Sequence, residues 1–302
     1  MKVAISTSSF GSSDNTPIEM LQSKGIEVLQ NPYGRKMTES EIIEHLHDVD
    51  GLLAGLEPLN KTVFEHCPQL KAIARVGIGM DNVDHFSAKK AGIKISNTPE
   101  GPTNAVAEMT LGAALVLSRN IIPANQALHE KKWAKSIGLG LKNTTILIVG
   151  YGRIGRRTAK LFKYVGCKIL ICDPLANESE IDKSFKLCDL QEGLRVAQIV
   201  SLHAAGDNPI LTPKEFGLMK DGVILLNSAR GNLIEEQALK DALDSGKVDS
   251  AWLDTFPSEP YSGVLTEYSQ LLLTPHMSTY STQCRKDMEI AAVNNLLRDL
   301  NC

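Results

Sequence analysis

Short apolar runs alternate with helical stretches along the first third of the chain. The apolar runs are residues 3–5, 26–29, 51–54, 72–76 and 93–95. Between them lie amphipathic segments such as residues 40–46, where Ile42, Ile43 and Leu46 recur at helical spacing. Short strands separated by helices are typical of a parallel sheet that is covered on both faces and connected by right-handed crossovers.

A second alternating series follows a break in this pattern. Pro99, Gly101 and Pro102 interrupt it, and residues 103–118 then have the composition of a long apolar helix. The later strands are predicted at residues 145–149, 168–172, 197–202, 222–226, 248–253 and 271–273. The final helical segment, residues 283–300, has no strand after it, and we expect it to fold back onto the first unit.

These patterns predict an α/β protein with two doubly wound parallel-sheet lobes and a cleft between them. The first, flavodoxin-like lobe is predicted at residues 1–98 plus 280–302 and is the expected substrate-binding domain. The second, Rossmann-type lobe is predicted at residues 99–279. A length of 302 residues, about twice that of a typical single domain, agrees with two domains.

The strand predicted at residues 145–149 runs into a glycine pattern typical of dinucleotide-binding turns. Residues 150–155 read Gly-Tyr-Gly-Arg-Ile-Gly, and a helical segment follows. In this setting Gly150 permits a tight turn, Gly152 lets the backbone approach a pyrophosphate, and Gly155 lets the helix pack closely on the strand. The pyrophosphate then lies at a helix N-terminus, whose unpaired N–H groups favour an anion.

A carboxylate follows the next predicted strand, where such folds bind the adenosine ribose. Asp173 lies 23 residues after Gly150, close to the expected spacing of about 20. A carboxylate repels a 2′-phosphate, and residues 174–177 hold no Arg or Lys, so NAD is favoured over NADP. The alternative is a plain glycine-rich turn followed by a loop carboxylate.

Three polar side chains follow apolar strands of the second series. They are Arg230, Glu259 and His276, which come after the strands near residues 223–226, 251–253 and 271–273. In doubly wound sheets the ligand lies beyond the carboxyl ends of the strands. Taken singly, each side chain is an ordinary loop residue. Their joint position downstream of the dinucleotide turn predicts a catalytic set.

Each member of this set suits one task in the oxidation of a 2-hydroxy acid. His276 is the candidate base for the hydroxyl proton, because the pKa of histidine lies near neutrality. Glu259 would orient the ring and favour its protonated form. Arg230 can bind a carboxylate through two parallel hydrogen bonds and polarise the adjacent carbonyl. His203 also ends an apolar strand and is the rival base.

The composition of the chain argues against several other classes of protein. The net charge of −3 and the absence of a Lys/Arg run argue against a nucleic-acid partner. The six cysteines show neither CxxC pairs nor zinc-ligand spacing, so we expect no metal site and free thiols. No apolar run is long enough for a membrane span or a signal peptide, and the expected location is the cytoplasm.

The motifs resemble those of the D-isomer-specific 2-hydroxyacid dehydrogenase family, and within it the short form of D-3-phosphoglycerate dehydrogenases. The resemblance covers nearly the whole chain. The matching stretches are residues 75–84, 97–99 with 106–108, 150–155, 227–231, 253–256 with 259–260, and 274–276.

This resemblance implies roles for individual residues. Arg230, Glu259 and His276 correspond to the family's catalytic residues, and His203 falls on the cofactor side. The cofactor-binding positions are Gly150, Gly152, Arg153, Ile154, Gly155, Asp173, Pro174, His203, Ser228, Ala229 and Asp254, of which the last three are expected at the nicotinamide half of NAD. The substrate-binding positions are Arg75, Val76, Gly77, Ile78 and Gly79, together with Arg230 and His276.

The substrate loop and the catalytic set come from different lobes, so the resemblance also implies that closure of the lobes assembles the site. The loop at residues 76–79 would hold the substrate carboxylate in an anion nest of backbone N–H groups. A homodimer is implied as well, with the helix from Thr103 contributing to its interface.

The predicted function is hydride transfer between NAD and C2 of a small D-2-hydroxy or 2-oxo acid. 3-Phosphoglycerate or a related acid is the expected substrate, and serine biosynthesis is the pathway that this acid suggests. Phosphoglycerate enzymes usually carry a basic residue just after the third strand, whereas residues 53–57 here read Leu-Ala-Gly-Leu-Glu. The alternatives are a phosphite or other small-anion dehydrogenase and a non-catalytic NAD(H)-sensing corepressor. Formate dehydrogenases of this fold place Gln where Glu259 stands, which argues against formate as the substrate.

Overall fold

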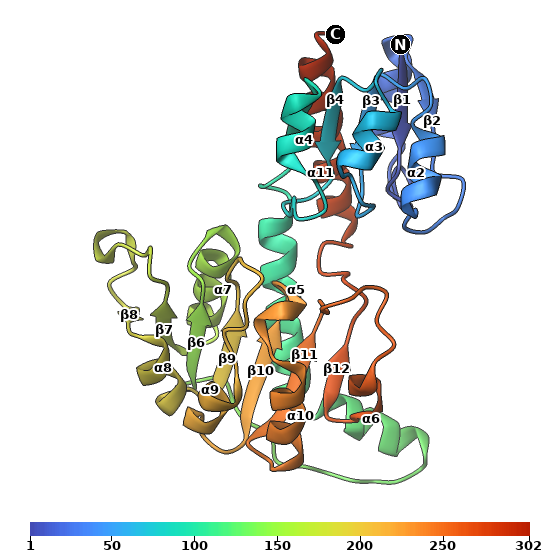
Figure 1. Cartoon of the computed structure of the whole chain (residues 1–302). Coiled ribbons are helices and arrows are strands. Elements are labelled where there is room, and N and C mark those ends of the chain that lie inside the picture. The colour runs from blue at the N-terminus through green and yellow to red at the C-terminus, as the bar shows by residue number, and fades with distance from the viewer. The chain divides into compact units, whose positions relative to one another are not determined.

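The computed structural model describes residues 1–302 except the side chain of residue 180. The chain divides into two compact units, residues 1–102 with 279–302 and residues 103–278 (Figure 1). The sequence predicts these divisions at residues 98–99 and 279–280. Each unit is built on its own parallel sheet, which confirms the predicted α/β class with two doubly wound sheets.

The first unit holds a five-stranded sheet in the order β2-β1-β3-β4-β5, with every pair parallel. Its strands are β1 (Lys2–Ile5), β2 (Glu27–Leu29), β3 (Gly51–Ala54), β4 (Ala72–Arg75) and β5 (Lys94–Asn97). Its helices are α1 (Thr16–Ser23), α2 (Glu39–His45), α3 (Lys61–His66), α4 (His85–Lys90) and α11 (Thr282–Leu300). The switch in strand order lies between β1 and β3, and their carboxyl ends therefore form the expected ligand edge of this unit.

The C-terminal helix α11 completes the first unit by packing against β3, β4, β5 and α1. Leu296 and Leu300 of this helix approach β3 at Gly51, where an added Cβ would lie 3.1 and 2.9 Å from their side chains. Asn295 also donates to the carbonyl oxygen of Asn97 at 2.9 Å. Apolar burial and close backbone approach thus bring two ends of the chain into one domain.

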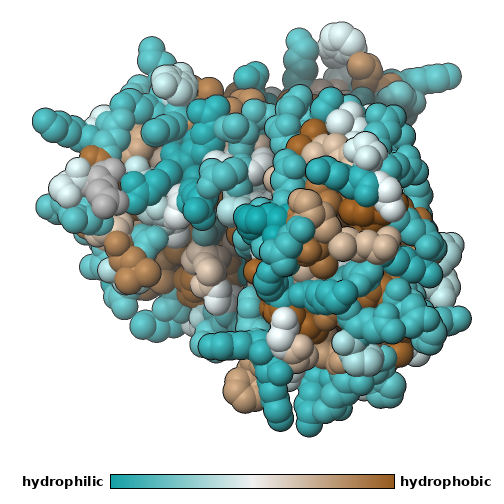
Figure 2. Space-filling model, turned by 90° about the horizontal axis from the view of Figure 1, so that it is seen from above, coloured by the Kyte–Doolittle hydropathy of each residue, from teal (hydrophilic) through white to brown (hydrophobic). Residues whose placement is uncertain are grey.

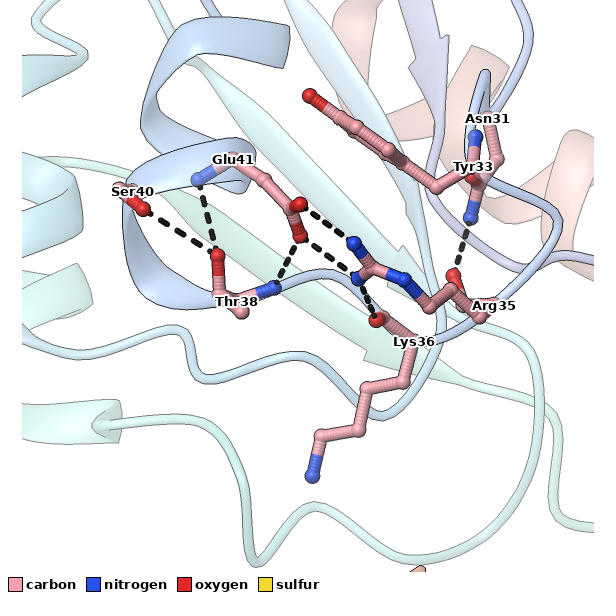
Figure 3. A network of polar contacts seen from close by, with 7 residues as sticks. All are labelled: Asn31, Tyr33, Arg35, Lys36, Thr38, Ser40 and Glu41. Carbon is pink, nitrogen blue, oxygen red and sulfur yellow. Dashed lines mark hydrogen bonds and ion pairs between the residues drawn. The ribbon is translucent and has the colours of Figure 1, made fainter.

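Polar contacts arrange the segment that leads into α2 (Figure 3). Thr38 caps the helix by accepting from the Glu41 N–H, and the Glu41 carboxylate accepts from the Thr38 N–H at 2.9 Å. Arg35 binds the same carboxylate through both terminal nitrogens, at 2.9 and 2.7 Å, and holds the pKa of Glu41 at about 2. The result is a reciprocal cap reinforced by a two-point ion pair.

The second unit holds a seven-stranded parallel sheet in the order β12-β11-β10-β9-β6-β7-β8. Its strands are β6 (Thr145–Val149), β7 (Lys168–Cys172), β8 (Lys186–Leu187), β9 (Ile199–Leu202), β10 (Val223–Asn227), β11 (Val248–Leu253) and β12 (Leu271–Leu273). Its α-helices are α5 (Pro102–Ser118), which begins at the unit boundary, α6 (Ile121–His129), α7 (Arg153–Tyr164), α8 (Leu190–Val196), α9 (Pro213–Leu218) and α10 (Glu236–Asp244). Three short 3₁₀ turns complete it, η1 (Glu178–Glu180), η2 (Gly231–Leu233) and η3 (Val264–Glu267).

The strands of this sheet are apolar because both faces of the sheet are covered. Along β6, Ile146 and Ile148 belong to one core cluster, whereas Leu147 and Val149 belong to the other. The period-two alternation of side chains therefore divides one apolar run between two cores. The sequence does not predict strand β8, because two residues are too few for a periodic signal.

Helices α5 and α6 are unequal in burial. Helix α5 contributes Ala113, Ala114 and Leu117 to a core cluster, but α6 has no buried residue.

Within the described residues no single helix is long and apolar enough to cross a membrane, and α5 and α6 meet that test only as a pair bent by 60°. Figure 2 shows a mostly hydrophilic face with apolar residues in patches between, as is normal for a folded protein.

Candidate active site

The glycines of the dinucleotide turn are placed as their spacing predicts, between β6 and α7. Gly150 has a left-handed backbone, with φ of +95°, and an added Cβ would lie 2.5 Å from the backbone after β9. A Cβ at Gly155 would collide with the carbonyl oxygen of Gly150. Gly152 has open space where a side chain would be, and it begins α7 without a side-chain cap. The helix N-terminus is therefore accessible to a pyrophosphate, which fits NAD.

Asp173 follows β7 and is held by backbone N–H groups. Its Oδ2 accepts from the Tyr151 N–H at 2.6 Å, and its Oδ1 accepts from the Leu175 N–H at 2.8 Å. Each oxygen keeps a further lone pair for a ribose hydroxyl. Arg153, which is exposed, and Ile154 lie in the first turn of α7, and Pro174 lies beside the carboxylate.

His203, the rival base, follows β9, and its backbone lies against Gly150 of the dinucleotide turn. Its N–H donates to the Val149 carbonyl oxygen at 2.7 Å, and its ring Nε2 lies 2.8 Å from the Ser201 hydroxyl. Burial lowers the pKa of His203 to about 4, so the ring is neutral near pH 7. Its backbone lies against Gly150, which matches a cofactor-side position.

His276 and Glu259 meet directly in the second unit. The His276 Nδ1 lies 2.8 Å from Glu259 Oε2, and Glu259 Oε1 accepts from the Phe256 N–H at 3.1 Å. Because a carboxylate accepts and does not donate, Nδ1 carries a hydrogen, and in the neutral form of the ring Nε2 carries the lone pair. The side chains are 36% and 27% exposed, so a small molecule can reach this pair.

Arg230 lies at the next strand end of the same sheet edge. Strands β10, β11 and β12 are neighbours, and they precede Arg230, Glu259 and His276 respectively. The loop after β10 touches the loop after β11 at Gly231, where an added Cβ would collide with the backbone of Phe256 and Pro257.

Fully buried Asn227 shapes the loop that carries Arg230. It accepts from the Ala229 N–H at 3.0 Å and donates to the Arg230 carbonyl oxygen at 2.9 Å. The Arg230 guanidinium donates to the Ala229 carbonyl oxygen at 2.8 Å, and the Ser228 hydroxyl lies 3.5 Å from that of Thr110. These contacts hold the loop after β10. Because β10, β11 and β12 are parallel neighbours, their ends bring the three predicted catalytic residues to one edge of the sheet.

Asp254 is an anchor for the backbone around His276. It is fully buried, and Oδ1 accepts from the Thr274 hydroxyl at 2.6 Å and the Met277 N–H at 2.9 Å. Its Oδ2 accepts from the Ser278 N–H at 2.9 Å and the Ser278 hydroxyl at 2.5 Å. His276 itself has a left-handed φ of +50°, which is uncommon for a residue with a side chain.

These four hydrogen bonds fasten the chain on both sides of His276. The carboxylate of Asp254, a residue for which the family resemblance implies a nicotinamide contact, accepts from residues 274–278 in the structure. No sequence signal identifies this arrangement, because its partners lie some twenty residues away in a turn without periodicity. The arrangement sets the direction in which the His276 ring leaves the backbone.

The predicted substrate loop lies in the first unit, after β4. Gly77 has φ of +140°, and its N–H donates to the Thr98 hydroxyl at 2.8 Å. Asn97 donates to the Ile78 carbonyl oxygen at 2.8 Å, and Arg75 is buried. Since the Gly77 N–H is engaged, an anion nest at this loop depends on the following residues, Ile78 and Gly79.

Glu57 lies at the carboxyl end of β3, where the resemblance leads one to expect a basic residue. The side chain is buried, and Oε1 accepts from the Gly55 N–H at 3.1 Å and from the Ser6 hydroxyl. Burial raises the pKa of the Glu57 carboxyl. The ends of β1 and β3 are thus joined by a carboxyl group.

The fold and this site define a dinucleotide-binding oxidoreductase of the Rossmann class. Residues 111–278 match the model of the NAD-binding domain of D-isomer specific 2-hydroxyacid dehydrogenases. The chain belongs to this family, and it is an NAD-dependent oxidoreductase. The predictions of family, enzyme class and cofactor are confirmed.

Relatives agree on the family and differ in their substrates. The chain is 33% identical over 290 residues to hydroxypyruvate reductase of Blautia hydrogenotrophica, covering 90% of each chain. It is 31% identical over 288 residues to D-3-phosphoglycerate dehydrogenase of Synechocystis, covering 92% of this chain and 51% of that one. The crystal structure of the TT0316 protein from Thermus thermophilus has a TM-score of 0.90 at 28% identity, covering 100% of this chain and 97% of that one.

The anchoring of His276 gives a direct prediction for Asp254→Asn. The amide nitrogen cannot accept a hydrogen bond, so at least one N–H or hydroxyl of residues 274–278 loses its acceptor. The expected loss in the free energy of unfolding is about 2–3 kcal/mol, because the lost bond is to a buried charged group. Urea denaturation measures it. Asp249→Asn, at an exposed position on β11, the strand that precedes Asp254, is the control and should change stability by less than about 0.5 kcal/mol. Equal losses in both variants would contradict the anchor.

Proposed function

We propose that this protein interconverts a small unphosphorylated 2-oxo acid and its D-2-hydroxy acid, with hydroxypyruvate and D-glycerate as the leading pair. The observation that carries the reaction type is the 2.8 Å contact between His276 and Glu259, at the same sheet edge as Arg230 and in the unit that carries the dinucleotide turn. These three residues supply a base, its orienting carboxylate and a carboxylate-binding cation.

The proton chemistry follows from the hydrogen bond at Nδ1. NAD, when bound, supplies the hydride acceptor, and NADH the donor. His276 Nε2 takes the hydroxyl proton as the alcohol is oxidised and returns it to the oxygen in the reverse direction. Glu259 accepts from Nδ1–H throughout, so it orients the ring and offsets the positive charge that the ring acquires. Arg230 binds the substrate carboxylate and draws electron density from the carbonyl.

The preference for an unphosphorylated acid rests on Glu57. This residue occupies the end of β3, and its contacts are with Ser6 and Gly55 of the expected ligand edge. A carboxyl group at that point offers no positive charge to a phosphate. The similarity to a hydroxypyruvate reductase over 90% of both chains supports the same choice. 3-Phosphoglycerate, the substrate expected from the sequence, is therefore the less favoured acid.

The assignment of the base is tested with His276→Gln and His203→Gln. Loss of the general base is expected to lower kcat by roughly 10²- to 10⁴-fold in His276→Gln, with NADH affinity retained. His203→Gln is expected to weaken NADH binding and to keep most of kcat at saturating NADH, because His203 lies at the dinucleotide turn. Steady-state kinetics and NADH fluorescence titration measure both. The reverse result, with turnover lost only in the His203 variant, would show that the base is misassigned.

The substrate is tested with a panel of 2-oxo acids and NADH at pH 7. Hydroxypyruvate is expected to exceed phosphohydroxypyruvate in kcat/KM by at least about tenfold, since a bound phosphate that finds no cation costs on the order of 1–3 kcal/mol. Glyoxylate and pyruvate, which lack the 3-hydroxyl and differ in size, are the comparison substrates. A preference for the phosphorylated acid would contradict the substrate proposal and leave the reaction type intact. NADH binding without turnover of any acid would favour a sensor.

The proposal includes a homodimer formed through α6 and the segment that follows it. Leu128, Trp133 and Ile137 are exposed by 56%, 81% and 102%, an unusual density of large apolar side chains for a monomer surface. The family resemblance places the subunit interface at the adjoining helix α5. A second copy that buries these side chains accounts for an apolar segment on the surface of a folded enzyme.

The dimer is tested by sedimentation equilibrium. The expected mass is twice the 32.9 kDa of one chain, and Trp133→Lys combined with Ile137→Asp is expected to yield a folded monomer. Phe86→Asp, at an exposed apolar position of the first unit, is the control and should leave the mass unchanged. A monomeric wild type, or a dimer that persists in the double variant, would contradict this interface.

A further inference from the structure

Two cysteines end neighbouring strands next to the adenosine side of the dinucleotide turn. Cys172 is the last residue of β7, and Cys188 follows the last residue of β8. The parallel register pairs Ile171 with Leu187, so Cys172 and Cys188 are the next pair along the ladder. The ladder does continue, because the Cys188 N–H donates to the Ile171 carbonyl oxygen at 3.0 Å.

Both thiols point to the same side of the sheet. Cys172 and Cys188 pack against the core cluster that contains Leu170, whereas Ile171 and Leu187 pack against the opposite cluster. This is the alternation that two adjacent strands in register must show. Both cysteines are half-buried and free, so a small oxidant can reach them.

The separation expected for such a pair is close to that of a disulfide. Neighbouring strands lie about 4.8 Å apart, within the Cα separation of about 4.4–6.8 Å that disulfides span. A disulfide holds its Cβ atoms about 3.8 Å apart, so bond formation draws the two strand ends together by about 1 Å. The thiols already influence each other, because burial and then the neighbouring Cys172 raise the pKa of Cys188 to about 11.

The position of Cys172 connects this pair to the cofactor. The Cys172 carbonyl oxygen accepts from the Gly150 N–H at 2.9 Å. The next residue is Asp173, whose carboxylate depends on the N–H groups of Tyr151 and Leu175. A shift of the end of β7 by about 1 Å therefore moves both the dinucleotide turn and the ribose-binding carboxylate.

We propose that Cys172 and Cys188 form an oxidisable thiol pair, and that their disulfide weakens the binding of NAD(H). The oxidant is hydrogen peroxide. One thiolate displaces hydroxide from peroxide to give a sulfenic acid, and the second thiol then attacks that sulfur and releases water. In sum, two thiols and one H₂O₂ give one disulfide and two waters, and the two electrons pass from sulfur to peroxide.

The surroundings of the pair set the conditions for this reaction. Burial raises the pKa of both thiols, and nearby acids add to the effect. Asp189 raises the pKa of both thiols, Asp173 raises that of Cys172, and Glu192 of α8 raises that of Cys188. Lys186 of β8 lowers the pKa of Cys188. Since the thiolate is the reacting form, oxidation is slow near pH 7 and accelerates as the pH rises toward 9. The pair therefore responds to sustained peroxide exposure rather than to brief pulses.

The test uses the full-length enzyme in a Cys302→Ala background, which removes the exposed thiol at the C-terminus. Protein is treated with peroxide at pH 8.5, where the thiolate fraction is about thirtyfold higher than at pH 7, and is then desalted and digested with trypsin without reduction. The expected product is a cross-link between the peptides of residues 169–183 and 187–195. NADH fluorescence titration is expected to show a Kd raised by about tenfold, restored by dithiothreitol.

Cys188→Ala is the matched variant, because it keeps one thiol of the pair and leaves the end of β7 unchanged. Before treatment it is expected to bind NADH like the parent, and after treatment it should keep its affinity. The absence of the 169–183 to 187–195 cross-link would overturn the proposed pair. A cross-link with unchanged NADH affinity would overturn its coupling to the cofactor, as would an equal loss of affinity in treated Cys188→Ala. None of these results depends on the identity of the acid substrate.

Discussion

The burial of both faces of the seven-stranded sheet is the constraint on which the second unit depends. Strands covered on both sides are filled with apolar residues and pair their backbone groups within the sheet. Polar side chains that take part in chemistry can then project only beyond the strand ends. Because all strands are parallel, their carboxyl ends lie at one edge, where Asp173, His203, Arg230, Glu259 and His276 are found.

Hydrogen bonds from backbone N–H groups position the carboxylates at this edge of the sheet. The Asp173 carboxylate is held by two of them, and Glu259 accepts from the Phe256 N–H while it orients His276. Asp254 binds two N–H groups and two hydroxyls around the left-handed His276. Hydrogen bonds from fixed backbone groups hold these carboxylates in position, so the geometry of the site follows from the loops that carry it.

Because the dinucleotide turn lies among strand ends, its geometry is sensitive to movements of the neighbouring strands. Gly150 lies against the backbone after β9 and donates to Cys172 at the end of β7, so three adjacent strand ends share one tightly packed turn. Close packing transmits small displacements, which is the basis for the coupling that we propose between the cysteine pair and NAD(H). In the first unit, Glu57 joins the ends of β1 and β3 in a comparable way.

Local sequence patterns were enough to establish the fold class, the dinucleotide turn and the cofactor. Periodic apolar runs predict the strands of the parallel sheets. The spacing of Gly150, Gly152 and Gly155 before Asp173 is a local requirement of a turn that must approach a pyrophosphate. The patterns also pointed to Arg230, Glu259 and His276, because each follows an apolar run. Tertiary packing settled which side chains meet: the bond from His276 to Glu259, the place of His203 at the dinucleotide turn, the anchoring by Asp254 and the burial of Glu57. These contacts join residues from separate loops, and their geometry comes from strand order and turn conformation, which no local pattern encodes.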